Sequence, residues 1–161
     1  MSTVKDQIRR ANEEYASSFE KGHLPMPPGR RFAVVTCMDA RLDPAKFLGL
    51  DEGDAHVIRN AGGLVSDDAF RSLVISHHLL GTQEAFVIGH TDCGMLTFNN
   101  DELRARLGPE AAGIDFLPFS DVNARVKESI RVIEQSQLLP DSFSATGFVY
   151  DVGSGLLREV A

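Results

Sequence analysis

The sequence has no tryptophan, two tyrosines and only two cysteines, Cys37 and Cys93, among 161 residues. A chain of this size with two cysteines is not a disulfide-stapled scaffold. No apolar run reaches the roughly 18 residues that a membrane span needs. The polar start, residues 1–6, lacks the apolar core of a secretory signal. We therefore expect a cytoplasmic protein with no membrane partner.

Basic residues are also scarce. The 16 lysines and arginines stand against 23 acidic residues, which gives a net charge of −7. Sequence-independent binding to nucleic acid needs a basic surface that neutralises phosphates, so we expect no nucleic-acid partner. Hydrophobic residues make up 43% and charged residues 24%, as in folded globular proteins. The length fits a single domain over residues 1–161.

The first 29 residues predict a helical arm on a stiff connection. Apolar side chains recur at helical spacing over residues 3–20: Val4, Ile8, Ala11, Tyr15 and Phe19. Thr3 and Asp6 have the spacing of a capping box, and Gly22 is expected to stop the helix. We assign residues 1–22 to this arm and residues 23–29, with three prolines, to a strut. The arm could place its apolar face on a second copy, so we expect a homodimer or homotetramer.

The rest of the chain alternates between strand and helix patterns. Short apolar runs predict strands at 32–36, 55–59, 85–89 and 146–150. Helical periodicity follows the second strand around residues 70–77, and the third around 122–133. The end of the chain reads as a hairpin that turns at residues 153–155. These patterns predict an α/β fold with a central, mostly parallel sheet of about four strands flanked by helices, plus an antiparallel C-terminal edge strand and the N-terminal arm.

Soft and borderline metal ligands follow two of the predicted strands. Cys37 comes directly after the first strand, and His90 and Cys93 come after the third. Ligand sites in open α/β sheets lie at the carboxyl ends of the strands, so the three side chains meet if these strands are neighbours. Two thiolates and one imidazole suit zinc and leave a fourth position open, as in catalytic zinc sites. The alternative is two buried thiols and a histidine that caps a helix.

A carboxylate and a guanidinium lie just beyond Cys37. Asp39 and Arg41 are two residues apart, so the arginine can clamp the carboxylate and keep it ionised. A fixed carboxylate beside a metal-bound water could accept its proton or orient its lone pairs. The alternative is an ordinary solvated ion pair at a strand–helix junction.

Three segments together resemble the β-class carbonic anhydrase family. They are residues 37–41 (CMDAR), 59–63 (RNAGG) and 90–95 (HTDCGM), in the order and separation of that family. The short chain is similar to the small prokaryote-like branch, which also includes carbonyl sulfide and carbon disulfide hydrolases. Part of the family has a regulatory anion pocket built around an indole. Because this chain has no tryptophan, we do not expect such a pocket here.

The resemblance implies a mechanism and a set of roles. It implies that Cys37, His90 and Cys93 bind Zn²⁺ and that Asp39 and Arg41 form the dyad beside it. The implied reaction is reversible hydration of carbon dioxide to bicarbonate by attack of zinc-bound hydroxide. The alternative is hydrolysis of carbonyl sulfide or carbon disulfide to hydrogen sulfide and CO₂ on the same site. A zinc-dependent binding module without turnover is the other class, and the dyad favours the enzyme.

The substrate pocket is predicted less sharply. Gly62, Gly63, Gly94 and Met95 are expected to line it, although a tight turn or a helix start explains the glycines equally well. Further candidate liners are Leu64, Val65 and Phe98. We expect Asp92 to cap the following helix, and the alternative is that it orients a ligand. The remaining histidines, in a strand, a helix and the strut, are expected to have packing or surface roles.

Overall fold

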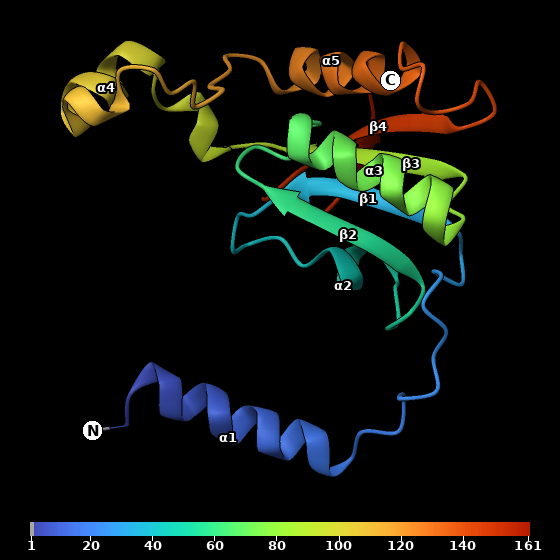
Figure 1. Cartoon of the computed structure of the whole chain (residues 1–161). Helices are drawn as coiled ribbons and strands as arrows, with labels where there is room; N and C mark the ends of the chain where they lie inside the picture. Colours follow the sequence, from blue (N-terminus) through green and yellow to red (C-terminus); the bar gives the residue numbers. More distant parts are fainter. Residues whose placement is uncertain (1) are drawn as a thin grey trace.

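The computed structural model of the chain describes residues 2–161, and its centre is one five-stranded sheet (Figure 1). The strands are β1 (Phe32–Cys37), β2 (Ala55–Asn60), β3 (Glu84–His90), β4 (Ser144–Tyr150) and β5 (Leu157–Glu159). Their order across the sheet is β2-β1-β3-β4-β5. The first four are parallel and β5 pairs antiparallel with β4. The predicted sheet, with its antiparallel C-terminal edge, is confirmed.

Helices cover both faces of the sheet. The longer ones, α3 (Asp67–Leu80) and α5 (Val122–Glu134), lie on one face, and the short α2 (Pro44–Leu48) lies on the other (Figure 1). Beyond the carboxyl ends of the strands the chain forms the 3-10 turn η1 (Gly94–Leu96), helix α4 (Asn100–Leu107) and the 3-10 turn η2 (Pro109–Ala111). This excursion between β3 and α5 projects from the body at the end where the parallel strands stop (Figure 1).

Strand β1 is buried along its whole length because both faces of the sheet are covered. Successive side chains point to opposite faces. Ala33 and Val35 therefore pack in the core beneath α3 and α5. Phe32 and Val34 pack in the other cluster, against residues of α2. The site-bearing end of β1 is thus held rigidly from both sides.

The N-terminal helix α1 (Val4–Ser17) buries none of its residues against the body, and it stands apart in Figure 1. The predicted capping box is present: the Thr3 hydroxyl accepts from the backbone N–H of Asp6, whose carboxylate accepts from the backbone N–H of Thr3. The predicted end is wrong, since the helix stops at Ser17, well before Gly22. The Ser17 hydroxyl donates to the Glu14 carbonyl, which shows the competition of serine with helical bonding.

None of the helices in residues 2–161 combines the length and the apolar character required to cross a bilayer. The expected cytoplasmic location stays a prediction.

Candidate active site

The carboxyl ends of β1 and β3 bring the three predicted ligands together. The two strands are paired in parallel, so Cys37 at the end of β1 and His90 at the end of β3 lie at the same edge of the sheet. Cys93 follows three residues later. The ligand atoms of the three buried side chains all lie within 4.8 Å of one another. No other group of this kind occurs in residues 2–161.

The imidazole of His90 is oriented with its Nε2 toward this cluster. Its Nδ1 lies 2.8 Å from the carbonyl oxygen of Thr91, which can only accept, so Nδ1 carries the proton in the neutral ring. Nε2 then carries the lone pair. That atom is fully buried and has no hydrogen-bond partner among the described residues. A buried polar atom without a partner is costly, and a cation between His90 and the two thiols would satisfy it.

The two thiols also favour a cation. Burial raises the pKa of Cys37, but His90 and the backbone N–H groups of Asp39 and Gly62 outweigh burial and lower the pKa to about 7. Burial raises the pKa of Cys93 to about 11, and the neighbouring Cys37 adds to the rise. Two thiolates so close together repel each other unless a positive ion lies between them. The donor set therefore fits Zn²⁺, which binds thiolate and imidazole.

Asp39 and Arg41 form a bidentate ion pair beside the cluster. Arg41 donates from Nε to Asp39 Oδ1 at 3.0 Å and from Nη2 to Oδ2 at 2.8 Å, and its backbone N–H donates to Oδ1 at 2.9 Å. These bonds from Arg41 hold the pKa of Asp39 well below its usual range. Asp39 Oδ2 lies 3.8 Å from Nε2 of His90. The pair is thus placed against the cluster of Cys37, His90 and Cys93 and is more than a solvated surface contact.

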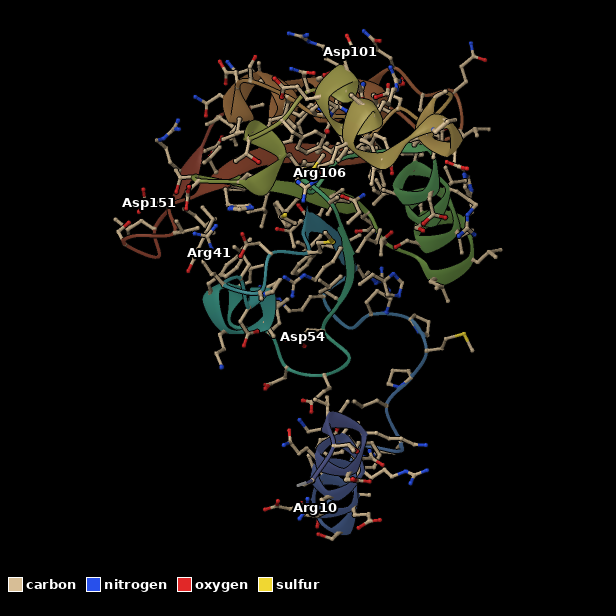
Figure 2. The ribbon with its side chains drawn as sticks, turned by 90° about the vertical axis from the view of Figure 1, so that its left-hand side faces the viewer. Arg10, Arg41, Asp54, Asp101, Arg106 and Asp151 are labelled. Carbon is tan, nitrogen blue, oxygen red and sulfur yellow. The ribbon has the colours of Figure 1, made fainter. Side chains whose placement is uncertain are left out.

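Asp92 does not cap a helix, contrary to the expectation. The residue before η1 is Cys93, and no side chain caps that turn. Asp92 instead adopts a left-handed backbone conformation, φ +53°, and accepts from Arg41. Figure 2 shows Arg41 on the body of the molecule near α2, far from Arg10 on α1.

Residues of β2 hold the loop that follows Cys37. Arg59 donates from Nε to the carbonyl of Cys37 at 2.9 Å and from Nη2 to that of Asp39 at 2.8 Å. The backbone N–H of Met38 donates to the Asn60 carbonyl at 2.9 Å. Asn60 also closes the glycine turn, since its side chain bonds both the N–H and the carbonyl of Leu64. The segment at 59–63 therefore supports the loop that carries Asp39.

A hollow of about 230 Å³ opens beside the cluster. Apart from Asp39 and the two cysteines, its lining is mostly apolar: Met38, Ala61, Gly62, Gly94, Met95 and Phe98. Gly63, Leu64 and Val65, which the sequence suggested as lining, do not line it. Val65 turns back into the core beneath α3 and α5, where its backbone N–H donates to Ser129 Oγ.

The comparisons with known proteins agree with this geometry. Residues 32–114 match the family model described as carbonic anhydrase. β-Carbonic anhydrase 1 of Mycobacterium tuberculosis is 49% identical over 162 residues, which cover 98% of both chains. The chain belongs to the β-carbonic anhydrase family. The crystal structure of a carbonic anhydrase from Streptococcus mutans matches it with a TM-score of 0.92 and 45% identity, over 100% of this chain and 99% of that one.

The β-carbonic anhydrase family also includes relatives named for another substrate. A carbon disulfide hydrolase from Acidianus is 33% identical over 183 aligned positions, which cover 97% of this chain and 88% of the hydrolase. The alignment with the hydrolase is longer than the chain itself, so the hydrolase carries insertions that this chain lacks.

One residue near the hollow was not found from the sequence. Phe119, in the loop before α5, donates its backbone N–H to the Met95 carbonyl. Its ring lies where a side chain at Gly62 would have to go, 2.9 Å from a Cβ built there. The sequence feature that could have indicated this residue is the apolar run at residues 116–119 within a loop.

Gly63 has a structural role that a substitution can test. Its φ is +65°, and a Cβ there would lie 2.8 Å from both the backbone nitrogen of Cys37 and the carbonyl carbon of Thr36. Gly63→Ala is therefore expected to lower the free energy of unfolding by about 1–3 kcal/mol, measured by urea titration. Gly113→Ala is the control, because no described atom lies within 4 Å of its Cβ. Equal stability of the two variants would contradict the close approach.

Proposed function

We propose that this β-carbonic anhydrase family member catalyses the reversible hydration of carbon dioxide, using Zn²⁺ held by Cys37, His90 and Cys93. In this reaction CO₂ and water give bicarbonate and a proton. The observation that carries the proposal is the buried, unpartnered Nε2 of His90, which shares one cluster with two thiols while a clamped carboxylate lies 3.8 Å away. When bound there, zinc acts as a Lewis acid that lowers the pKa of water.

The three ligands set the charge and the open side of the site. Two thiolates and a neutral imidazole would compensate the charge of a divalent ion, and three protein ligands leave one position for water. The carbonyl of Thr91 fixes His90 as a donor of its Nε2 lone pair. The carbonyls of Cys37 and Asp39 are both held by Arg59, which supports the ligand and the dyad together.

Asp39 would orient the water by accepting its hydrogen bond. Oδ1 of Asp39 already accepts two bonds from Arg41, whereas Oδ2 accepts one and faces His90. Oδ2 is therefore the atom with a lone pair left for a water molecule. Because Arg41 keeps the pKa of Asp39 low, the carboxylate stays ionised and able to accept a hydrogen bond at neutral pH.

The lining of the hollow suits a small molecule without hydrogen-bonding groups. Ala61, Met95 and Phe98 offer apolar surface, and Gly62 leaves room for the ring of Phe119. Carbon dioxide is linear and uncharged, so orientation depends on shape more than on polar contacts.

Carbonyl sulfide and carbon disulfide are the competing substrates, since they present a similar electrophilic carbon. Two observations support carbon dioxide. The relative at 49% identity, whose alignment spans 162 positions, is named a carbonic anhydrase, whereas the alignment with the carbon disulfide hydrolase is extended to 183 positions by insertions. The structure with a TM-score of 0.92 is also named a carbonic anhydrase.

The substrate is tested by comparing carbon dioxide, carbonyl sulfide and carbon disulfide on one zinc-loaded preparation. We expect stopped-flow hydration of CO₂ with kcat/KM in the upper part of the usual range of about 10⁴–10⁸ M⁻¹ s⁻¹. Sulfide release from carbonyl sulfide and carbon disulfide is expected to be much slower. Efficient sulfide release together with CO₂ hydration barely above the buffer rate would replace the proposal by the sulfur-gas hydrolase.

The assembly is proposed to be a homodimer or a homotetramer, in which α1 packs on a second copy. Val4, Ile8 and Tyr15 form an apolar stripe on α1 and are 70%, 64% and 51% exposed. A stripe of this kind on an isolated helix has no stabilising partner within the same chain, and such exposed apolar surfaces mark interfaces.

Disrupting the stripe is expected to weaken assembly. Ile8→Asp, or deletion of residues 1–22, should shift the sedimentation velocity toward the monomer and lower activity with it. Glu13→Lys, on the opposite side of the same helix, is the matched control and should leave the assembly intact. An unchanged oligomer after the deletion would show that α1 has no part in assembly, and a fully active monomer would show that activity does not depend on assembly.

A further inference from the structure

Arg41 binds two different loops at once. It donates to both carboxylate oxygens of Asp39, and from Nη1 it donates to Oδ2 of Asp92 at 2.7 Å. Its Nη2 also donates to the backbone carbonyl of Asp92 at 2.8 Å. Four of the five N–H donors of the guanidinium are thus engaged, and two of them hold the turn between His90 and Cys93.

The bonds to Asp92 connect the dyad to the turn between His90 and Cys93. Asp39 and Arg41 lie in one loop, so their mutual bonds fix the two side chains relative to each other but not relative to the metal ligands. Asp92 lies between His90 and Cys93 in the sequence, on the turn that joins these two residues. A guanidinium is planar and rigid. Because Nε and Nη2 of Arg41 bind Asp39, the bond from Nη1 to Asp92 fixes the plane of the guanidinium and with it the orientation of the Asp39 carboxylate.

We propose that Asp92 is a positioning residue which, through Nη1 of Arg41, sets the place of the Asp39 carboxylate relative to the metal ligands. The inference rests on the proposed function, because its effect on turnover requires that Asp39 act on water. The backbone supports it: Asp92 has φ +53°, a strained conformation that aspartate tolerates better than most residues and that directs its carboxylate to Arg41.

The left-handed conformation allows a clean pair of variants. Asp92→Gly removes the carboxylate and fits the backbone without strain, and it leaves the backbone bond from Arg41 Nη2 in place. Asp92→Asn also suits this conformation and restores a side-chain oxygen that can accept from Nη1. A loss in Asp92→Gly that Asp92→Asn recovers therefore reports the acceptor atom and not the shape of the turn.

We expect Asp92→Gly to lower kcat for CO₂ by about tenfold, at the low end of the effect of losing an outer-shell partner, because the backbone bond remains. KM and the zinc content should stay unchanged, and Asp92→Asn should recover most of kcat. Asp68→Ala is the control for loss of a surface ion pair, since Asp68 binds Arg71 at 2.8 Å on α3, outside the site.

A second measurement does not depend on activity. In wild type, both Nη groups of Arg41 are held, so their isotope-labelled protons should give separate NMR signals, assigned by their loss in Arg41→Lys. Asp92→Gly should free rotation about the bond to Nη1 and average the two Nη1 proton signals, while the Nη2 signals stay separate, in the zinc-free protein as well.

Three results would overturn the inference: an unchanged kcat in Asp92→Gly, a fall in kcat matched by a fall in zinc content, or no recovery in Asp92→Asn. If wild type itself fails to hydrate CO₂, the proposed function fails, and the Nη signals alone then decide whether Asp92 holds Arg41.

Discussion

Replacing Cys93 by serine is expected to remove both the metal and the activity. A hydroxyl is a far weaker zinc ligand than a thiolate, and it does not ionise at neutral pH. Loss of an outer-shell partner already costs about 10- to 100-fold in metal affinity or activity, and loss of a direct ligand should exceed the upper figure. Metal content by elemental analysis and CO₂ hydration by stopped flow should therefore fall together.

The fold should survive this replacement, which makes the result interpretable. Cys93 is a small buried side chain, and serine is nearly isosteric with it. The replacement also removes one of two buried thiols that lie side by side. Burial and the neighbouring Cys37 raise the pKa of Cys93 to about 11, so the thiolate form of Cys93 is disfavoured in the absence of a cation. Full zinc occupancy in a folded Cys93→Ser protein, judged by circular dichroism and elemental analysis, would refute the ligand assignment.

The ligand cluster could be anticipated from the sequence because it depends on the sheet alone. Buried parallel strands appear as short apolar runs, and the residues that follow the predicted runs, Cys37 and His90, share one edge of the sheet when the strands are neighbours. The short helix α2 carried a readable signal that was not used, an N-cap aspartate followed by Pro44 at the first helical position.

Residues that reach the site from irregular backbone could not be placed in this way. Asp92 was misjudged because a left-handed φ at an aspartate cannot be inferred from its neighbours, and this φ turns the side chain from the expected cap to Arg41. Phe119 arrives from a loop 24 residues after Met95, where no periodicity constrains the path. Val65 also follows irregular backbone. The chain changes direction at the glycine turn before it, so its side chain packs in the core and not in the hollow.

Asp39→Asn is expected to leave zinc bound and to reduce turnover severely. An amide oxygen can still accept from Arg41 at the Oδ1 position, but the NH₂ group that replaces Oδ2 is a donor and cannot accept the hydrogen bond of the water. Misplacement of a reacting group by about 1 Å can cost about 10²-fold in rate, and we expect a loss of this size when the water is no longer oriented. The pKa of Asp39 is held low by Arg41, so the wild-type carboxylate is ionised under assay conditions and its loss should be felt in full.

The decisive comparison for Asp39 is between rate and metal content. Asp39 is not one of the three clustered ligands, and its Oδ2 lies 3.8 Å from His90 Nε2, so Asp39→Asn should keep zinc at the wild-type level while kcat falls. Asp68→Asn, which alters an exposed aspartate that is likewise bound to an arginine, should change neither quantity. Added imidazole-type buffers that accept protons in solution should not restore Asp39→Asn, because the missing group orients the water through a fixed bond. Wild-type kcat in zinc-loaded Asp39→Asn would show that Arg41 clamps a carboxylate with no part in the chemistry.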